Sequence, residues 1–317
     1  MTAAWLERPE GGSALALRLL VWVALGLGRT ITRLVLLPIT VYFLLRRRPE
    51  REASRAYLNK VLGRPQTLLE IARHFHTFAS VTLDRVYFLA DRLRLFDTRV
   101  SGIPELHRAM DQGCGVLLIG AHVGSFDALR ALSLQRPDVE IRVVLDAAHS
   151  PILSAILKRL NPTIASSIID PRKEGTTVAL EIGAALKRGA LVTMLADRGR
   201  PGNPEVAVDF LGSPARFPTA PWQIAAALHT PVVLCVGLFR GGRRYDLHFE
   251  QISEGLQLPR RGRQEHVHSL VKRYAERLTH FLRLAPYNWF NFYDFWTDFQ
   301  ADADQPGSRR LSDDDRL

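Results

Sequence analysis

Cysteine is scarce in this chain of 317 residues. Cys114 and Cys235 are the only two, and both lie in apolar, strand-like surroundings. Two such residues exclude a disulfide scaffold and are typical of buried structural thiols in a reducing compartment. The chain also lacks zinc-finger spacing, aromatic-basic RNA-binding motifs and internal repeats. We therefore expect neither a metal site nor a nucleic-acid partner.

Acidic residues are outnumbered by basic ones. The 42 Lys and Arg residues exceed the 32 Asp and Glu residues by 10, which gives a net charge of +10. A basic surface suits nucleic acid, anionic lipid or an acidic protein partner. An apolar N-terminal segment favours lipid among these three, and a hydrophobic content of 47% leaves enough apolar residues for a large core as well.

Long uninterrupted apolar runs are also missing. The most apolar segment, residues 14–45, is broken by Arg18, Arg29, Arg33 and Pro38, whereas a spanning helix needs about 20 apolar residues with few charges. The segment is too long and too interrupted for a cleaved signal peptide. It predicts a retained membrane anchor, either one tilted helix or a shallow helical hairpin; the alternative is a buried core helix.

A run of arginines follows the apolar segment directly. Arg46, Arg47 and Arg48 are followed by Arg51 and Arg55. Basic residues beside an anchor favour the cytoplasmic side and attract anionic headgroups, although a solvated charge run would look the same. We therefore divide the chain into an anchor with its basic flank (1–48), a main domain (49–300) and a polar, disordered tail (301–317).

The chain is organised around residues 113–127. Val116–Ile119 is a short apolar run between glycines, which predicts a strand buried on both faces. A helix is expected to follow, with Ser125 as its N-cap. His122 then lies in the turn that leaves the strand, and Asp127 lies in the first turn of the helix. In open α/β sheets this edge binds ligands.

His122 and Asp127 are five residues apart across a turn that contains Gly124. If the Asp127 carboxylate reaches one imidazole nitrogen, it fixes the tautomer and leaves the other nitrogen free as a base for a hydroxyl proton. The alternative is a capping aspartate with an incidental histidine in the turn.

A second constellation, meaning a group of polar residues that directly follows a predicted strand, occurs later in the chain. The predicted strand 191–195 ends in Asp197-Arg198-Gly199. Arg198 suits a phosphate or pantetheine group, and Asp197 could orient Arg198 or contact an acceptor; a local ion pair in a surface turn is the alternative. Thr219, within Phe217-Pro218-Thr219-Ala220, is a candidate pocket residue but also a natural N-cap.

The remaining pattern alternates between strands and helices. It predicts helical structure over 57–95, 150–160, 176–188 and 266–284, and a possible strand over 164–169. Such alternation indicates an α/β fold with a mixed, largely parallel sheet and helices on both faces, preceded by the membrane-anchor helix.

Several motifs together resemble one family. They are His122-Val123-Gly124-Ser125-Phe126-Asp127 (an H-x4-D motif), Asp197-Arg198-Gly199, Phe210-Leu211-Gly212 and Phe217-Pro218-Thr219-Ala220. In this order, after an apolar N-terminal segment, they are similar to the glycerolipid-type acyltransferases, in the bacterial branch of the lipid A late acyltransferases (lauroyl and myristoyl transferases). The aromatic segment 286–296 looks more like the acyltransferase-like members associated with aryl polyene lipid pathways.

The resemblance implies a membrane-associated acyltransferase that forms an ester with a hydroxyl (an O-acyltransferase). It implies a glycerolipid acyltransferase-like fold, working without a cofactor on the cytoplasmic side of the bacterial inner membrane. It implies an acyl carrier protein thioester as donor, with acyl-CoA second, and the hydroxyl of a glycolipid such as lipid A as acceptor. His122 would be the general base and Asp127 its orienting residue. Backbone amides near Gly124, or Arg198, would stabilise the oxyanion.

Three other functions fit the same residues. The acceptor could be a lysophospholipid or another glycolipid. A His/Asp hydrolase would release free fatty acid without an acceptor, and a non-catalytic lipid-binding membrane protein would transfer no acyl group at all.

Overall fold

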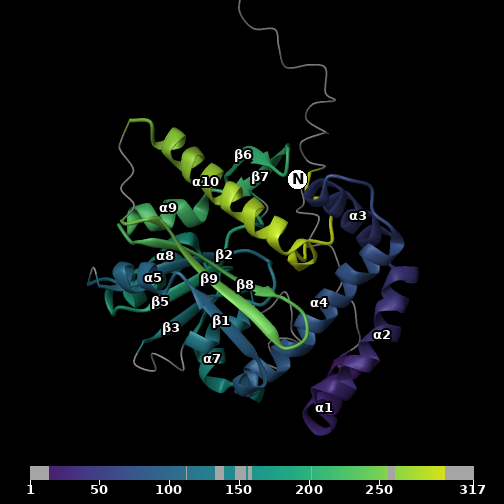
Figure 1. Cartoon of the computed structure of the whole chain (residues 1–317). Helices are drawn as coiled ribbons and strands as arrows, with labels where there is room; N and C mark the ends of the chain where they lie inside the picture. The colour runs from purple at the N-terminus through teal and green to yellow at the C-terminus, as the bar shows by residue number, and fades with distance from the viewer. Residues whose placement is uncertain are drawn as a thin grey trace, which may run out of the picture.

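The computed structural model describes residues 14–111, 113–132, 139–146, 155, 159–200, 202–255 and 261–296, of which 14–20, 130–132 and 164 are described by their backbone alone. The predicted tail 301–317 and most of the predicted helix 150–160 lie outside these ranges. The described chain forms a mixed α/β structure with helices on both faces of one large sheet (Figure 1).

The large sheet has seven strands in the order β1-β9-β8-β2-β5-β3-β4. Only the β8–β9 pair is antiparallel, and every other neighbouring pair is parallel. Its strands are β1 (Asp97–Ser101), β2 (Val116–Gly120), β3 (Ile141–Val144), β4 (Ile168–Ile169), β5 (Leu191–Leu195), β8 (Val232–Phe239) and β9 (Arg244–Ser253). The largely parallel sheet expected from the alternating pattern is thus confirmed.

The central strand β2 shows why the apolar runs form strands here. Leu117 and Ile119 pack into one apolar cluster, and Val116 and Leu118 pack into the other, on the opposite face. Because side chains alternate along a strand, a continuous apolar run is needed when both faces are covered.

Helices cover both faces of the sheet. One cluster includes α8 (Gly175–Lys187), α9 (Ala220–Ala227) and α10 (Arg263–Leu284); the other includes α5 (Ile103–Met110) and the second half of α4 (Leu68–Leu89). A two-stranded antiparallel ribbon, β6 (Glu205–Phe210) and β7 (Ser213–Pro218), packs against α10. The remaining elements are α7 (Pro162–Ser166) and the 3₁₀ turns η1 (Leu93–Leu95), η2 (Asp127–Leu132) and η3 (Pro286–Asn288).

The N-terminal apolar segment forms two helices that lie along one side of the molecule beside α4 (Figure 1). They are α1 (Ala14–Leu27) and α2 (Arg29–Arg46), and the break falls at Gly28, whose φ of 83° suits glycine. Within the described ranges, no helix combines the length and the apolar character needed to cross a bilayer. The membrane anchor expected from the sequence therefore stays a prediction.

Two sequence expectations are wrong in detail. The helical segment 57–95 is divided between α3 (Arg48–Leu62) and α4, because Gly63 ends α3 at a positive φ and Thr67 begins α4 with a capping box to Glu70. The strand expected over 164–169 shrinks to Ile168–Ile169, because α7 takes the residues before it.

Candidate active site

The register of two neighbouring strands brings the two predicted constellations together. β2 and β5 are adjacent and parallel, with Gly120 opposite Leu195. The pairing continues one residue further, where the Ala196 N–H donates to the Gly120 carbonyl over 3.0 Å. His122 and Asp197 each lie two residues beyond these strand ends, so they face one another at the carboxyl edge of the sheet.

His122 is hydrogen-bonded to Asp197. Its Nδ1 lies 2.8 Å from Oδ1 of Asp197, and its own backbone N–H donates to Oδ2 over 3.0 Å. A carboxylate only accepts hydrogen bonds, so Nδ1 carries the proton and Nε2 holds the free lone pair. The imidazole is 29% exposed whereas the carboxylate is fully buried, so a substrate can reach the histidine but not its partner.

Two residues from the C-terminal aromatic segment complete the surroundings of Asp197. The Trp289 indole N–H and the Asn291 amide each donate to Oδ2 over 3.1 Å. Trp289 and Asn291 are themselves buried. Four donors therefore converge on one buried carboxylate, which is how a buried charge is stabilised.

These contacts shift the pKa values of Asp197 and His122. Burial alone would raise the pKa of Asp197, but His122 and Arg198 outweigh it and hold that pKa far below its usual range. Burial and the nearby Arg198 charge lower the pKa of His122, against the opposing effect of Asp197. At neutral pH the pair is thus a neutral imidazole beside an ionised carboxylate.

The carboxylate of Asp127 has another partner. Its Oδ2 accepts from Nε of Arg85, on α4, over 2.5 Å. The contact expected between Asp127 and the His122 ring is therefore not the one that the structure makes, because Asp197 occupies Nδ1. Arg85 lies close enough for its charge to lower the pKa of His122 slightly, so Asp127 holds a cation beside the imidazole.

Gly124 forms the tight turn after His122. Its φ is +55°, and a Cβ there would lie 2.0 Å from the Gly237 carbonyl oxygen. Its N–H donates to the Asn288 carbonyl, and the Ser125 N–H donates to the Gly237 carbonyl. The amides of Gly124 and Ser125, which lie in the region where oxyanion donors were expected, are thus engaged within the protein. The Ser125 hydroxyl accepts from the Ala128 N–H over 3.2 Å, as the side chain of a helix cap does, although the element that follows is the 3₁₀ turn η2.

Arg198 binds the C-terminal segment. Its Nε donates to Asn291 Oδ1 over 2.6 Å, one terminal nitrogen donates to the Phe290 carbonyl, and its guanidinium lies 5.7 Å from the Tyr293 ring centre. In this conformation Arg198 connects the end of β5 to the segment that also holds Asp197.

Thr219 lies at the start of α9. Its hydroxyl donates to the Pro204 carbonyl over 3.1 Å and accepts from Gln223. It is 7% exposed, and these contacts support a structural role at the turn between Pro204 and α9.

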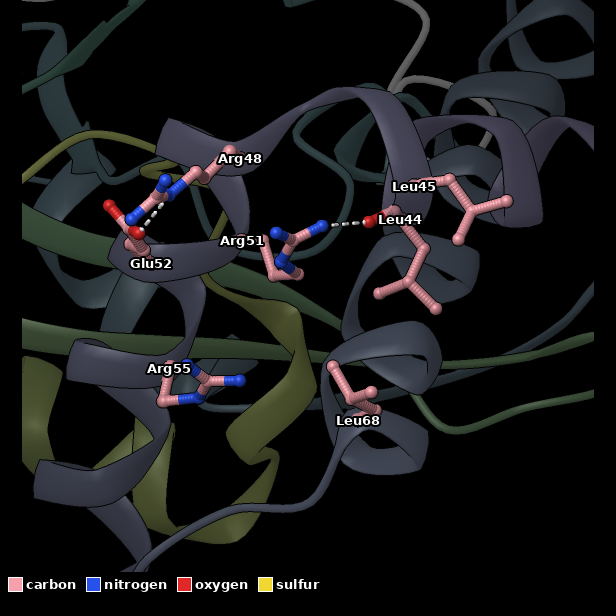
Figure 2. Close-up of a pocket in the computed structure, with 7 residues that line it drawn as sticks. All are labelled: Leu44, Leu45, Arg48, Arg51, Glu52, Arg55 and Leu68. Carbon is pink, nitrogen blue, oxygen red and sulfur yellow. Dashed lines mark hydrogen bonds and ion pairs between the residues drawn. The ribbon is translucent and has the colours of Figure 1, made fainter.

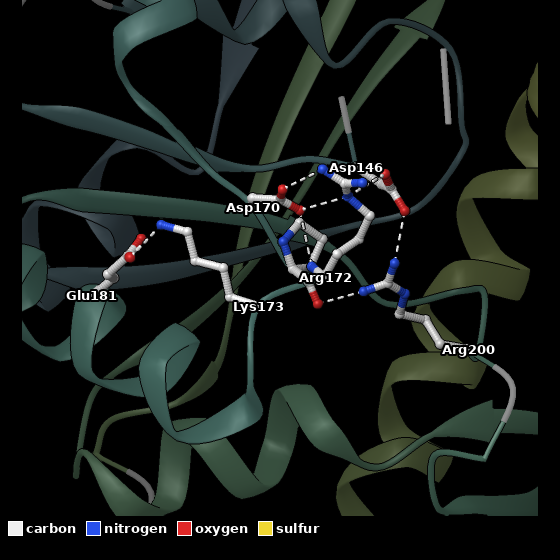
Figure 3. A network of polar contacts seen from close by, with 7 residues as sticks. Asp146, Asp170, Arg172, Lys173, Glu181 and Arg200 are labelled. Carbon is white, nitrogen blue, oxygen red and sulfur yellow. Dashed lines mark hydrogen bonds and ion pairs between the residues drawn. The ribbon is translucent and has the colours of Figure 1, made fainter. Parts of the chain in front are cut away.

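Charged side chains line the sheet edge next to this site. Asp146 follows β3, Asp170 follows β4, and Arg200 lies beyond Asp197. Figure 3 shows Arg172 and Arg200 both directed at Asp146, at 3.5 and 2.7 Å, with Arg172 also paired to Asp170 at 2.7 Å. Lys173 pairs with Glu181. Arg172, Lys173 and Arg200 are thus each matched by a carboxylate.

Sequence reasoning missed three residues of this site: Arg85, Trp289 and Asn291. No spacing connects them to His122, because they come from α4 and from the segment after α10. The one available signal was the high density of aromatic residues after Pro286. Among the described side chains, no group of three or more His, Cys, Asp or Glu residues is arranged to hold a metal ion.

The comparisons agree with the ordered motifs. A family model described as bacterial lipid A biosynthesis acyltransferase matches residues 20–297. A search of curated proteins finds no match.

Proposed function

The chain belongs to the bacterial lipid A biosynthesis acyltransferase family, and we propose that it moves a fatty acyl group from a thioester to a hydroxyl of a glycolipid. The donor is an acyl carrier protein thioester, with acyl-CoA as second choice, and the acceptor is lipid A or a related outer-membrane lipid. Acyl carrier proteins are acidic, so a net charge of +10 favours their association.

The observation that carries this proposal is the bond between His122 and the buried Asp197. In the proposed step, Nε2 of His122 takes the proton from the acceptor hydroxyl as its oxygen attacks the thioester carbonyl. A C–O bond forms and the C–S bond breaks. The thiolate leaves and takes the proton from the imidazolium, which the Asp197 carboxylate stabilises while it exists. The enzyme itself forms no covalent intermediate.

Asp127 acts in this scheme through Arg85. The Asp127 carboxylate fixes the guanidinium at 2.5 Å, and Arg85 is 39% exposed on its side chain, so it can reach a bound substrate. A positioned guanidinium beside the base stabilises the negative charge that develops on the thioester oxygen. We therefore propose Arg85 as the oxyanion donor and Asp127 as its positioning residue, in place of the engaged amides of Gly124 and Ser125.

Helix α2 supports association with a membrane. Its buried face, packed on α4, carries Thr32 and Thr40, whose hydroxyls donate to the main chain four residues back. Its exposed face is apolar, and Leu34 and Leu45 are 64% and 71% exposed. The full exposed apolar set on this helix is Ile31, Leu34, Val35, Leu37, Val41, Tyr42 and Leu45. A contiguous apolar face of this kind marks an interaction surface, and on a helix at the protein surface it suits the bilayer interface.

We propose that this face lies in the bacterial inner membrane on its cytoplasmic side. The buried Asp84 of α4 pairs with Arg29 at 2.7 Å and accepts from Tyr245 at 2.8 Å, which holds the start of α2 on the main domain. The proposed membrane surface is thereby attached to the domain that carries the active site. Arg46–Arg48, where α2 ends and α3 begins, suit the cytoplasmic leaflet.

Acyl transfer by the purified protein in detergent tests the function. Labelled acyl carrier protein thioester is offered with a glycolipid extract, and His122→Ala is compared with the wild type and with His107→Ala, an exposed histidine on α5. We expect the wild type and His107→Ala to make a labelled lipid and His122→Ala to make none.

Two other results would contradict this function. Free fatty acid released at the same rate with and without acceptor would make the protein a thioester hydrolase. No turnover with any donor would favour a lipid-binding role.

A further inference from the structure

A surface pocket lies where α2, α3 and α4 meet. Its volume is about 510 Å³. The end of α2, one face of α3 and the first residue of α4 form its walls (Figure 2). The lining residues are Leu44, Leu45, Arg48, Arg51, Glu52, Arg55 and Leu68.

The charged side of the pocket has a surplus of cations. Arg48 is balanced by Glu52, whose Oε1 lies 2.8 Å from its Nε. Arg51 donates to the Leu44 carbonyl over 2.5 Å, which orders its guanidinium. Arg55 has no hydrogen-bond or ion-pair partner in the described part of the chain. In Figure 2, the guanidinium groups of Arg51 and Arg55 extend toward the space in front of the leucines, whereas Arg48 extends toward Glu52.

The opposite side of the pocket is apolar and continues the exposed face of α2. Leu45 ends that face, and Leu68, which is 55% exposed, stands across from it at the start of α4. The surface is therefore apolar along α2 from Leu34 to Leu45 and becomes cationic inside the pocket. A bilayer has the same order, since its hydrocarbon gives way to charged headgroups.

We propose that this pocket binds the phosphate of an anionic lipid headgroup. Arg51 and Arg55 pair with the phosphate oxygens, which guanidinium groups do well, and Leu45 and Leu68 contact the glycerol and the first methylenes of the acyl chains. The proposal rests on the membrane association proposed above and adds a lipid class and a defined site. Occupancy would fix how α2 is oriented on the membrane surface.

Vesicle co-sedimentation of the full chain tests the site. Phosphatidylcholine vesicles are compared with vesicles in which part of the phosphatidylcholine is replaced by phosphatidylglycerol. Arg55→Gln is compared with Arg46→Gln, a matched exposed arginine outside the pocket lining that also has no described partner. One arginine near an anionic surface contributes roughly five-fold to partitioning.

Arg46→Gln removes only diffuse attraction, so it is expected to lose at most about five-fold in binding to the anionic vesicles. Arg55→Gln also removes a phosphate contact, so it is expected to lose clearly more than Arg46→Gln on these vesicles and nothing on phosphatidylcholine alone. Arg51→Gln should follow Arg55→Gln. Equal losses for Arg55→Gln and Arg46→Gln would mean diffuse charge attraction and would overturn the pocket.

Two other results would reassign the pocket. Inorganic phosphate, offered alone, could bind the wild type but not Arg55→Gln, which would make the ligand a soluble phosphate. Unchanged vesicle binding by Arg55→Gln together with a raised KM for the carrier protein thioester would make it a protein contact. Both results would overturn the lipid assignment.

The test separates this proposal from the ones it rests on. Wild type that binds neither kind of vesicle would refute the membrane association itself. His122→Ala is expected to bind both kinds as the wild type does, and Arg55→Gln is expected to keep wild-type transfer in detergent. If acyl transfer fails, the vesicle-binding result for Arg55→Gln can therefore still be interpreted.

Discussion

Replacing Asp197 by Asn is the sharpest test of which carboxylate serves the base. Oδ2 of Asp197 accepts three hydrogen bonds, from the His122 backbone N–H, Trp289 and Asn291. Oδ1 accepts one, from Nδ1 of His122. An asparagine can present an oxygen to only one of these two sets.

The geometry decides which set retains an acceptor. An amide NH2 at the Oδ2 position would face three donors, so the asparagine oxygen takes that position and its NH2 faces the imidazole. Nδ1 of His122 must then accept a hydrogen bond, which moves the ring proton to Nε2. The nitrogen that should take the hydroxyl proton is thus already protonated.

We expect Asp197→Asn to lower kcat by about three to four orders of magnitude, the loss seen when the analogous aspartate of a serine protease triad is replaced by asparagine. This corresponds to roughly 4–5.5 kcal/mol of transition-state stabilisation. The fold should survive, because three of the four donors keep their acceptor. The assay is single-turnover acyl transfer, with thermal unfolding as the control for folding.

Asp127→Asn is the matched comparison. It leaves Nδ1 of His122 bonded to Asp197, so it should cost far less than Asp197→Asn. Activity of Asp197→Asn within ten-fold of the wild type, or a larger loss from Asp127→Asn, would refute the assignment of Asp197 as the partner of the base.

Three further substitutions have defined outcomes. Arg85→Gln should lower kcat by about a hundred-fold or more, as loss of an oxyanion donor does, and Asp127→Asn should lower it less; equal activity of Arg85→Gln and wild type would count against the proposed role. Gly124→Ala should destabilise the protein measurably in urea unfolding, because its Cβ would lie 2.0 Å from the Gly237 carbonyl oxygen at a φ of +55°; an unchanged midpoint would contradict that packing. Burial lowers the pKa of His74 from 6.5 to about 4, so below pH 6.5 the unfolded chain binds a proton that the folded protein does not. The free energy of unfolding is therefore expected to fall by roughly 3 kcal/mol between pH 6.5 and pH 4 through this residue. His74→Asn should flatten that pH dependence, and an unchanged slope would show that other groups cause it.

Much of the sheet could be predicted from the sequence. Continuous apolar runs located β2 and β5, and both polar constellations were expected at strand ends. Strand order could not be predicted, because no local pattern records which strands are neighbours. The pairing of Asp197 with His122 depends on that order, since only adjacent parallel strands in register bring residues two beyond Gly120 and Leu195 together.

The role expected for Asp127 also shows that spacing along the chain does not determine which residues are in contact. Five residues of separation made contact with His122 sterically reasonable, but Nδ1 can donate only one hydrogen bond along its N–H direction. A buried carboxylate from β5 takes that position, and an arginine from α4 takes the Asp127 carboxylate. Local spacing predicted a contact between Asp127 and the ring that the structure does not make, and finding Asp197 in that place required contacts that are distant in sequence.

The C-terminal aromatic segment links these observations. Its aromatic composition suits a cap packed on the core as well as a contact with an acyl chain or the membrane interface. The structure buries Trp289 completely, donates its indole N–H to Asp197, and bonds its carbonyl to Nε2 of His74 over 2.8 Å. A hydrogen-bonded path therefore runs from α4 through Trp289 and Asp197 to His122. Because every member of that path is buried except the reactive histidine, the segment after α10 fixes the base in place while leaving only its imidazole open to substrate.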